Sequence, residues 1–131
     1  MKLNNAFPKS EKLTHQKLFD VLFKQGNKAF QYPILALWSS VNLEENVRFQ
    51  AGFSVPKKHF KKAHDRNRLK RWLREAFRTE NKNLELALEE KNIQLAIIFI
   101  TVKNDNISFD LIQPKMRLLL KEITEQVLNV E

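Results

Sequence analysis

The side chains with the clearest chemical consequence gather in one stretch, residues 57–78, which reads KKHFKKAHDRNRLKRWLREAFR. Ten Lys and Arg stand there against two acids, Asp65 and Glu75, which leaves the stretch with a net charge of +8. The whole chain also carries +8, so the remaining residues are electrically balanced. Such a concentrated charge is typical of a protein that binds a polyanion, and nucleic acid is the first candidate.

Side chains that perform catalysis are scarce. The chain has no Cys, which excludes a thiol nucleophile, a disulfide framework and Cys-ligated zinc. His15, His59 and His64 lack the HExxH spacing and an evident Ser or Asp partner, so we interpret them as surface or phosphate-contacting residues. The adjacent carboxylates at 44–45 and 89–90 indicate solvated charge, because a two-metal nuclease needs carboxylates that converge from different elements. We predict no catalytic side chain and no metal site.

A length of 131 residues with 43% hydrophobic content favours one domain with one core, residues 1–131, in which residues 1–12 are extended or flexible. No apolar run approaches the roughly 20 residues that span a membrane. The first residues also lack the long apolar segment of a secretory signal. The absence of Cys suits a reducing compartment, so we expect a cytoplasmic protein.

Hydrophobic spacing predicts the order helix, strand, strand, basic helix, strand, helix, with residues 84–90 as a short helix or a continuation of the basic one. Residues 47–55 alternate apolar and polar, and the polar residues 43–46 before them indicate a hairpin with the preceding strand. Residues 93–102 are apolar on both faces, which is typical of a central strand. The fold class is therefore an α/β (α+β) two-layer sandwich with one small mixed sheet and packed helices. The predicted bounds are 15–25, 34–41, 47–55, 66–78 with Asp65 as its N-cap, 84–90, 93–102 and 114–129.

The basic helix has two distinct sides. Its apolar residues recur at i, i+3, i+4, i+7 and i+8, a pattern that packs one face on a core. Acids that would pair with its cations at i,i+4 are nearly absent, and Arg suits phosphate contacts, so a merely solvated helix face explains the pattern less well than phosphate binding. The apolar side consists of Leu69, Trp72, Leu73, Ala76 and Phe77, and the opposite side of Asn67, Arg71, Arg74 and Arg78.

Aromatic side chains give a second, more ambiguous pattern. Leu18, Val21 and Leu22 form the core stripe of the first predicted helix, and Phe19 and Phe23 share a face beside it. On periodicity alone this pair fits either the core or a platform on which single-stranded bases stack. Trp38 on the first predicted strand leaves the same two alternatives open.

Four segments together resemble the protein subunit of bacterial ribonuclease P. Residues 66–78 are similar to that family's signature helix nearly throughout. Lys12-Leu13 followed by Phe19-x-x-x-Phe23-Lys24-x-Gly26 resembles its first helix. Residues 52–58, Gly-Phe-Ser-Val-Pro-Lys-Lys, resemble the strand that leads into the basic connection, and the late strand and last helix also fit. The resemblance covers about residues 8–128.

The resemblance implies a left-handed βαβ crossover that contains the signature helix. It implies a ribonucleoprotein endonuclease that removes the 5′ leader of precursor tRNA, with ribonuclease P RNA and precursor tRNA as partners. The RNA subunit would be the catalyst and would bind most of the Mg²⁺, and no organic cofactor or obligate protein partner is expected.

The resemblance also assigns roles to residues. Arg66, Asn67, Arg68, Lys70, Arg71 and Arg74 would contact the catalytic RNA or its junction with substrate. Phe19, Phe23, Ser54, Lys58 and Trp38 would line a cleft for the leader, with Leu37 as the alternative to Trp38. Lys57, Lys61, Lys62 and Arg78 would add phosphate contacts. Residues 59–65 form a longer connection than many members have.

Three other interpretations stay open at this point. A general RNA-binding or ribosome-associated module would use the same basic face. A helix lying on an anionic membrane is disfavoured, because the core needs the apolar side of the basic helix. A nuclease that acts without RNA would require a carboxylate site that the sequence does not indicate.

Overall fold

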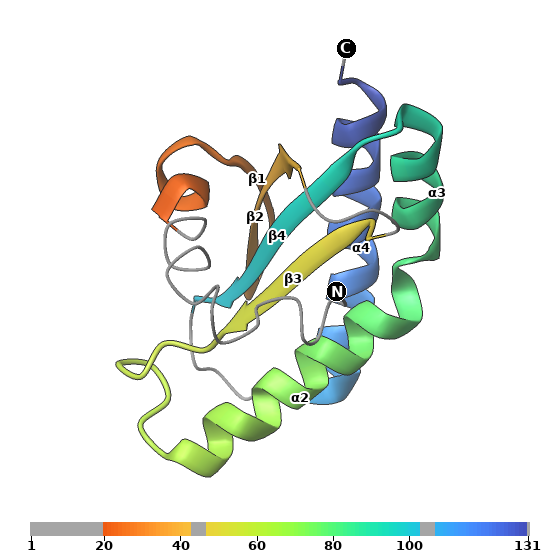
Figure 1. The fold of residues 1–131 in the computed structure, drawn as a ribbon. Helices are drawn as coiled ribbons and strands as arrows, with labels where there is room; N and C mark the ends of the chain where they lie inside the picture. Colours follow the sequence, from red (N-terminus) through yellow and green to blue (C-terminus); the bar gives the residue numbers. More distant parts are fainter. Residues whose placement is uncertain (1–19, 43–46, 103–106, 131) are drawn as a thin grey trace.

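The structure, a computed structural model, describes residues 20–42, 47–102 and 107–130. In these residues one four-stranded sheet, in the order β1-β2-β4-β3, is covered on one face by helices (Figure 1). This two-layer arrangement confirms the predicted fold class. A helical segment at residues 20–25 precedes the sheet. The other elements are β1 (Asn27–Gln31), β2 (Ile34–Val41), β3 (Phe49–Ser54), α2 (Ala63–Glu80), α3 (Lys82–Lys91), β4 (Gln94–Thr101) and α4 (Phe109–Leu128).

The strand pairing differs from the predicted hairpin. β2 does not pair with β3. It lies antiparallel to both β1 and β4, and β3 joins the other side of β4 in parallel. β4 is buried along almost its whole length. A central position between two strands removes more of its apolar surface from water than an edge position would. The parallel β3–β4 pair needs a long crossover, which α2 and α3 provide. The left-handed sense of this crossover stays a prediction.

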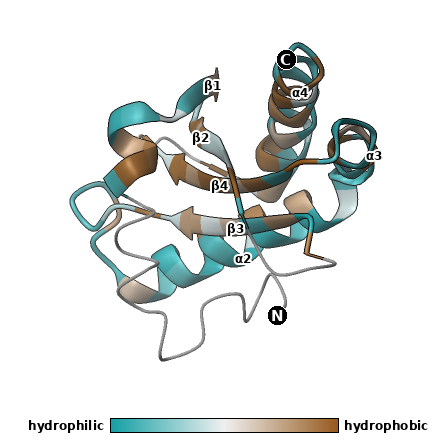
Figure 2. Cartoon of the chain, turned by 45° about the horizontal axis from the view of Figure 1, so that its top comes forward, coloured by the Kyte–Doolittle hydropathy of each residue, from teal (hydrophilic) through white to brown (hydrophobic). Residues whose placement is uncertain are grey.

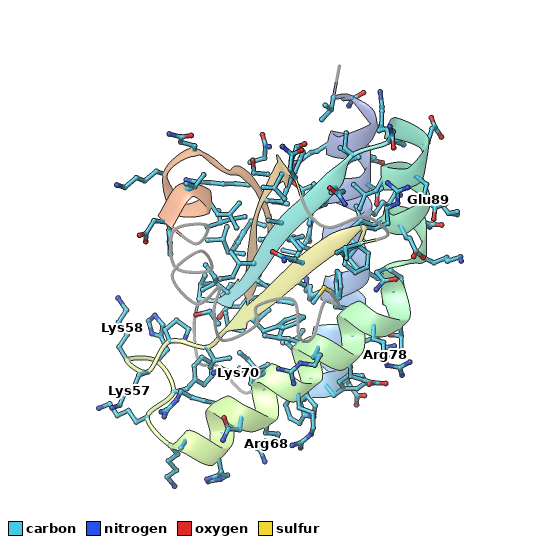
Figure 3. The ribbon with its side chains drawn as sticks, in the orientation of Figure 1. Lys57, Lys58, Arg68, Lys70, Arg78 and Glu89 are labelled. Carbon is cyan, nitrogen blue, oxygen red and sulfur yellow. The ribbon has the colours of Figure 1, made fainter. Side chains whose placement is uncertain are left out.

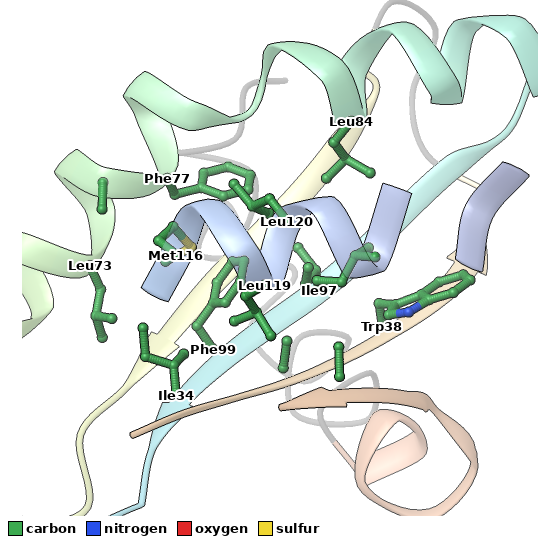
Figure 4. Close-up of a cluster of buried hydrophobic side chains, with 14 of the residues drawn as sticks. Ile34, Trp38, Leu73, Phe77, Leu84, Ile97, Phe99, Met116, Leu119 and Leu120 are labelled. Atoms are coloured by element: carbon green, nitrogen blue, oxygen red, sulfur yellow. The ribbon is translucent and has the colours of Figure 1, made fainter. Parts of the chain in front are cut away.

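The main core fills the space between the sheet and the helices (Figure 4). Phe77 of α2 lies at its centre, with its ring centroid 5.2 Å from Phe49, 6.1 Å from Phe53 and 5.3 Å from Phe99. The predicted apolar side of the basic helix is confirmed as core-facing, although Trp72 is only partly buried. The buried residues of α4 are Ile112, Met116, Leu119, Leu120, Ile123 and Val127.

The opposite side of the sheet carries a second, smaller apolar cluster. It contains Leu37, Ile98 and Ile100, with Leu35 packed against it, and we call this side the second sheet face. Of the stripe predicted for the first helix, Leu22 joins this cluster, whereas Val21 is exposed. The described part of that segment therefore touches the sheet through Leu22. Leu18 lies outside the described residues.

Three helix starts lie earlier than the sequence predicts, α3 by two residues and α2 and α4 by more. α2 begins at Ala63, so Lys62 occupies the N-cap position without a side-chain cap and Asp65 lies inside the first turn. A carboxylate in the first turn still interacts favourably with the helix dipole, so Asp65 stabilises the start of α2 without being its N-cap. α4 begins at Phe109, where the Oγ atom of Ser108 accepts a hydrogen bond from the backbone N–H of Leu111 at 3.4 Å. Pro114 therefore lies within α4 rather than at its start.

Candidate nucleic-acid interface

α2 is held by one side and presents its cations on the other. Leu69, Leu73 and Phe77 are buried against the core, whereas Arg71 and Arg74 are exposed. Figure 2 shows hydrophilic colours over most of α2, whereas β4 in the sheet is mostly hydrophobic. The amphipathic spacing in the sequence therefore predicts correctly which residues of this helix reach solvent.

Six cations of the basic stretch have no interaction partner among the described residues. The positive electrostatic potentials of cations that have no counter-charge add together at the surface, and the summed potential attracts a polyanion. Figure 3 shows Lys57 and Lys58 extending from the connection that leads into α2, hereafter the basic connection, residues 55–62. All of the six are exposed except Lys70, which is partly buried. They are Lys57, Lys58, Lys61, Lys62, Lys70 and Arg71.

Arg66 is largely engaged in shaping the basic connection. Its Nη1 atom donates to the carbonyl oxygens of Phe60 at 2.8 Å and Lys61 at 2.9 Å. Phe60 is itself buried in the core, and its backbone N–H donates to the carbonyl of Pro56 at 3.1 Å. Arg66 thus fastens the connection to the first turns of α2, and its remaining N–H groups stay available for an RNA contact. The predicted contact with RNA stays a prediction.

The other arginines of α2 are partly occupied. Arg68 donates to Asp65 at 3.1 Å and lies over the ring of Trp72, 5.3 Å from its centroid. Arg74 lies 5.5 Å from the centroid of Phe53 on the edge strand β3. Cation–π contacts of this kind restrain a guanidinium group without neutralising its charge. Both groups are therefore oriented in advance and remain positively charged.

Arg78 pairs with a carboxylate more fully than Arg68 does, because it donates two hydrogen bonds to Glu75 whereas Arg68 donates one to Asp65. The Nε atom of Arg78 donates to Oε1 of Glu75 at 3.2 Å, and this hydrogen bond lowers the pKa of the Glu75 carboxyl group. The same pair raises the pKa of Arg78. At neutral pH both groups are charged, so Glu75 offsets the positive charge of Arg78 at the C-terminal end of α2.

Removing this carboxylate should strengthen RNA binding. We expect Glu75→Gln to raise the affinity for a polyanionic RNA by about two- to fivefold, because it adds one net positive charge and frees one cation. The log–log dependence of the affinity on salt concentration should become steeper by up to about 0.9. Filter binding at several salt concentrations would measure both changes. The control is Glu125→Gln on α4, which changes the net charge equally but lies outside the basic stretch. Equal gains for both variants would contradict the role of the Glu75–Arg78 pair.

The residues predicted for the leader cleft fall in different places. Ser54 pairs in register with Ile100, so its side chain lies on the second sheet face at the end of β3. Lys58 is exposed on the basic connection just beyond. Phe23 is 52% exposed. Phe19, its predicted companion, lies outside the described residues.

Trp38 is not part of this surface, and its prediction as a cleft residue is wrong. It is 2% exposed, lies in the main core, and donates from Nε1 to Oε1 of Gln126 on α4 at 2.6 Å. Alternate residues of a strand face opposite sides. Trp38 therefore shares the helix-covered side with Ala36, while Leu37 lies on the second sheet face.

The fold and the site together define a class: small single-sheet α/β proteins whose basic helix and connection bind polyanions. The chain belongs to the ribonuclease P family, since the family model described as Ribonuclease P matches residues 7–124. The Ribonuclease P protein component of Porphyromonas gingivalis (strain ATCC BAA-308 / W83) is 31% identical over 120 residues, which cover 91% of this chain and 87% of the relative. That of Pseudoalteromonas atlantica is 40% identical over 80 residues, which cover 61% and 64%.

Solved structures agree with the fold. The RNase P protein of Staphylococcus aureus matches with a TM-score of 0.64 at 24% identity, over 86% of this chain and 93% of that one. The RNase P protein of Thermotoga maritima matches with a TM-score of 0.58 at 25% identity, over 81% and 92%. The predicted family and the predicted fold class are both confirmed.

Proposed function

We propose that this chain is the RNA-binding protein component of ribonuclease P and assists removal of the 5′ leader from precursor tRNA. The uncompensated cations of α2 and the basic connection support this, in a chain whose family is that of ribonuclease P proteins. α2 binds the catalytic RNA near its junction with the substrate. The second sheet face, entered past Ser54 and Lys58, receives the single-stranded leader.

Catalysis belongs to the RNA subunit in this proposal. The described residues contain no group of three or more His, Cys, Asp or Glu side chains that could hold a metal ion. No step is therefore assigned to a protein-bound metal, and Mg²⁺ bound by the RNA would stabilise the charge that develops at the cleaved phosphate. The protein side chains position the two RNAs and lower the repulsion between their phosphates.

The number of free cations sets the expected salt dependence. If each of the six unpartnered cations contacts one phosphate, the affinity falls with a log–log salt slope of about −4 to −5. A membrane-surface role is not favoured, because the apolar side of α2 is buried in the core. In the described part of the chain, moreover, every helix is too short or too polar to cross a membrane.

The test is cleavage of a precursor tRNA at low Mg²⁺ concentration by protein alone, by a bacterial ribonuclease P RNA alone, and by both. We expect cleavage in the mixture only, and loss of that gain when Arg66 and Arg68 are both changed to Ala. RNA binding with no gain in cleavage would favour the general RNA-binding module. Cleavage by the protein alone, abolished by a single carboxylate substitution, would establish a nuclease that acts without RNA.

A further inference from the structure

β1, the strand that the sequence analysis did not predict, places an aromatic ring at the surface. Phe30 is 47% exposed, although it lies in the strand rather than in a loop. It pairs in register with Leu35, which belongs to the second sheet face. Residues directly opposite each other in an antiparallel pair project to the same side, so Phe30 lies on the second sheet face as well.

Phe30 ends a row of side chains that crosses all four strands. The register runs from Phe30 to Leu35, from Leu35 to Ile100, and from Ile100 to Ser54. This row is the one nearest the basic connection, because β3 ends at Ser54. Three strand spacings give it a width of about 14 Å. The row therefore links the predicted leader residues on β3 to the free edge of the sheet at β1.

Cations stand at both ends of this row. Lys28 pairs with Leu37, so it also belongs to the second sheet face, and it is exposed two residues from Phe30. Lys57 and Lys58 follow the other end of the row. Leu35 is partly buried and Ile100 is 7% exposed, so the row offers RNA its two ends rather than a continuous apolar floor. An exposed ring with flanking cations suits single-stranded RNA, whose bases stack on aromatic side chains while phosphates meet Lys. The exposed acid nearest in sequence to Phe30 is Asp20, which lies in the helical segment before β1.

We propose that Phe30 is a base-stacking residue for the distal part of the leader, an inference that rests on the proposed function. α2 and the basic connection hold the RNA junction beside β3, so the leader must span the width of the sheet to reach Phe30 at the β1 edge. The 14 Å row corresponds to about four stacked nucleotides at a rise of about 3.4 Å each. Nucleotides next to the cleavage site therefore do not meet Phe30, and more distant ones do. Tyr32, exposed in the turn after β1, lies at the same end of the sheet.

The experiment compares leader lengths in the assembled holoenzyme. Precursor tRNAs with leaders of about two and about eight nucleotides, below and above the estimated span, are bound to wild-type, Phe30→Leu and Phe30→Trp holoenzymes. Leu retains the apolar contact with Leu35 but has no aromatic face, whereas Trp retains one. Phe30→Leu is expected to weaken binding of the long-leader substrate by about fivefold or more, with no effect on the short one. Phe30→Trp should bind both as the wild type does.

Two controls separate stacking from folding. Leu118→Ala on α4 alters a side chain that is likewise 47% exposed, and it should leave both affinities unchanged. A 2-aminopurine base at each leader position reports stacking by its quenching, which should be lost in Phe30→Leu at a distal position only. If the wild type gains from the long leader and Phe30→Leu gains equally, the role of Phe30 is overturned and the proposed function stands. A wild type that gains nothing from any leader overturns both.

Discussion

The double substitution of Lys70 and Arg71 by Ala is expected to lower the affinity of the protein for ribonuclease P RNA by about 100-fold. Neither side chain has a partner among the described residues, so neither loss leaves a buried or unpaired group in the protein. Each charged hydrogen bond to phosphate contributes about 1.5 kcal/mol, which is about tenfold in affinity. The log–log salt slope should become shallower by about 1.4 to 1.8, since two phosphate contacts are removed.

The matched control uses the same number of charges on another surface. Lys115 and Lys121 of α4 also have no partner in the described part of the chain, so changing both to Ala removes the same net charge from the protein. Filter binding over a range of salt concentrations should show little change for this control. If the two double variants lose affinity equally, net charge rather than the face of α2 governs binding.

The substitution Phe77→Ala should have the largest effect on stability. Phe77 is buried against Phe49, Phe53 and Phe99, and its loss removes the ring that joins α2 to two strands. Replacing a buried Phe by Ala costs about 3–5 kcal/mol, a large part of the 5–15 kcal/mol that stabilises a typical domain. In a domain of this size the melting temperature should fall by about 10–20 °C.

Calorimetry or circular dichroism would measure this change. Leu86→Ala on α3 is the control, because Leu86 is an exposed apolar residue and its loss should alter the free energy of unfolding by less than about 0.5 kcal/mol. Below the transition, Phe77→Ala should still bind RNA, since its cationic side chains are unchanged. A melting temperature equal to that of the wild type would show that α2 is not held by this aromatic cluster.

Local pattern alone predicted α2 and α4 well. The spacing of Leu69, Leu73 and Phe77 is a property of consecutive residues, and a helix turns that spacing into one buried side. The charge excess is equally local, so the cationic side of α2 followed from it without any tertiary contact. The start of α4 was predicted too late, because a Pro is acceptable in the first turn of a helix and Pro114 indicated such a turn. The Ser108 cap lies farther upstream.

Strand pairing, by contrast, depends on residues far apart in the chain. β2 and β3 are close in sequence and each is a good strand, yet β4 pairs with both because its two apolar faces gain most from a central position. β1 was missed, since its five residues have too little alternation to distinguish a strand from a loop.

The amino-acid sequence was enough to predict the fold class, the family, the basic helix and its exposed cations. Which side of the sheet the helices cover depends on tertiary packing, and this packing places Trp38 in the core and leaves Leu37 on the second sheet face. It also brought Phe30 into the row that ends at Ser54. The reason is physical: side-chain alternation shows that a strand has two faces, but only packing against other elements decides which of them meets solvent.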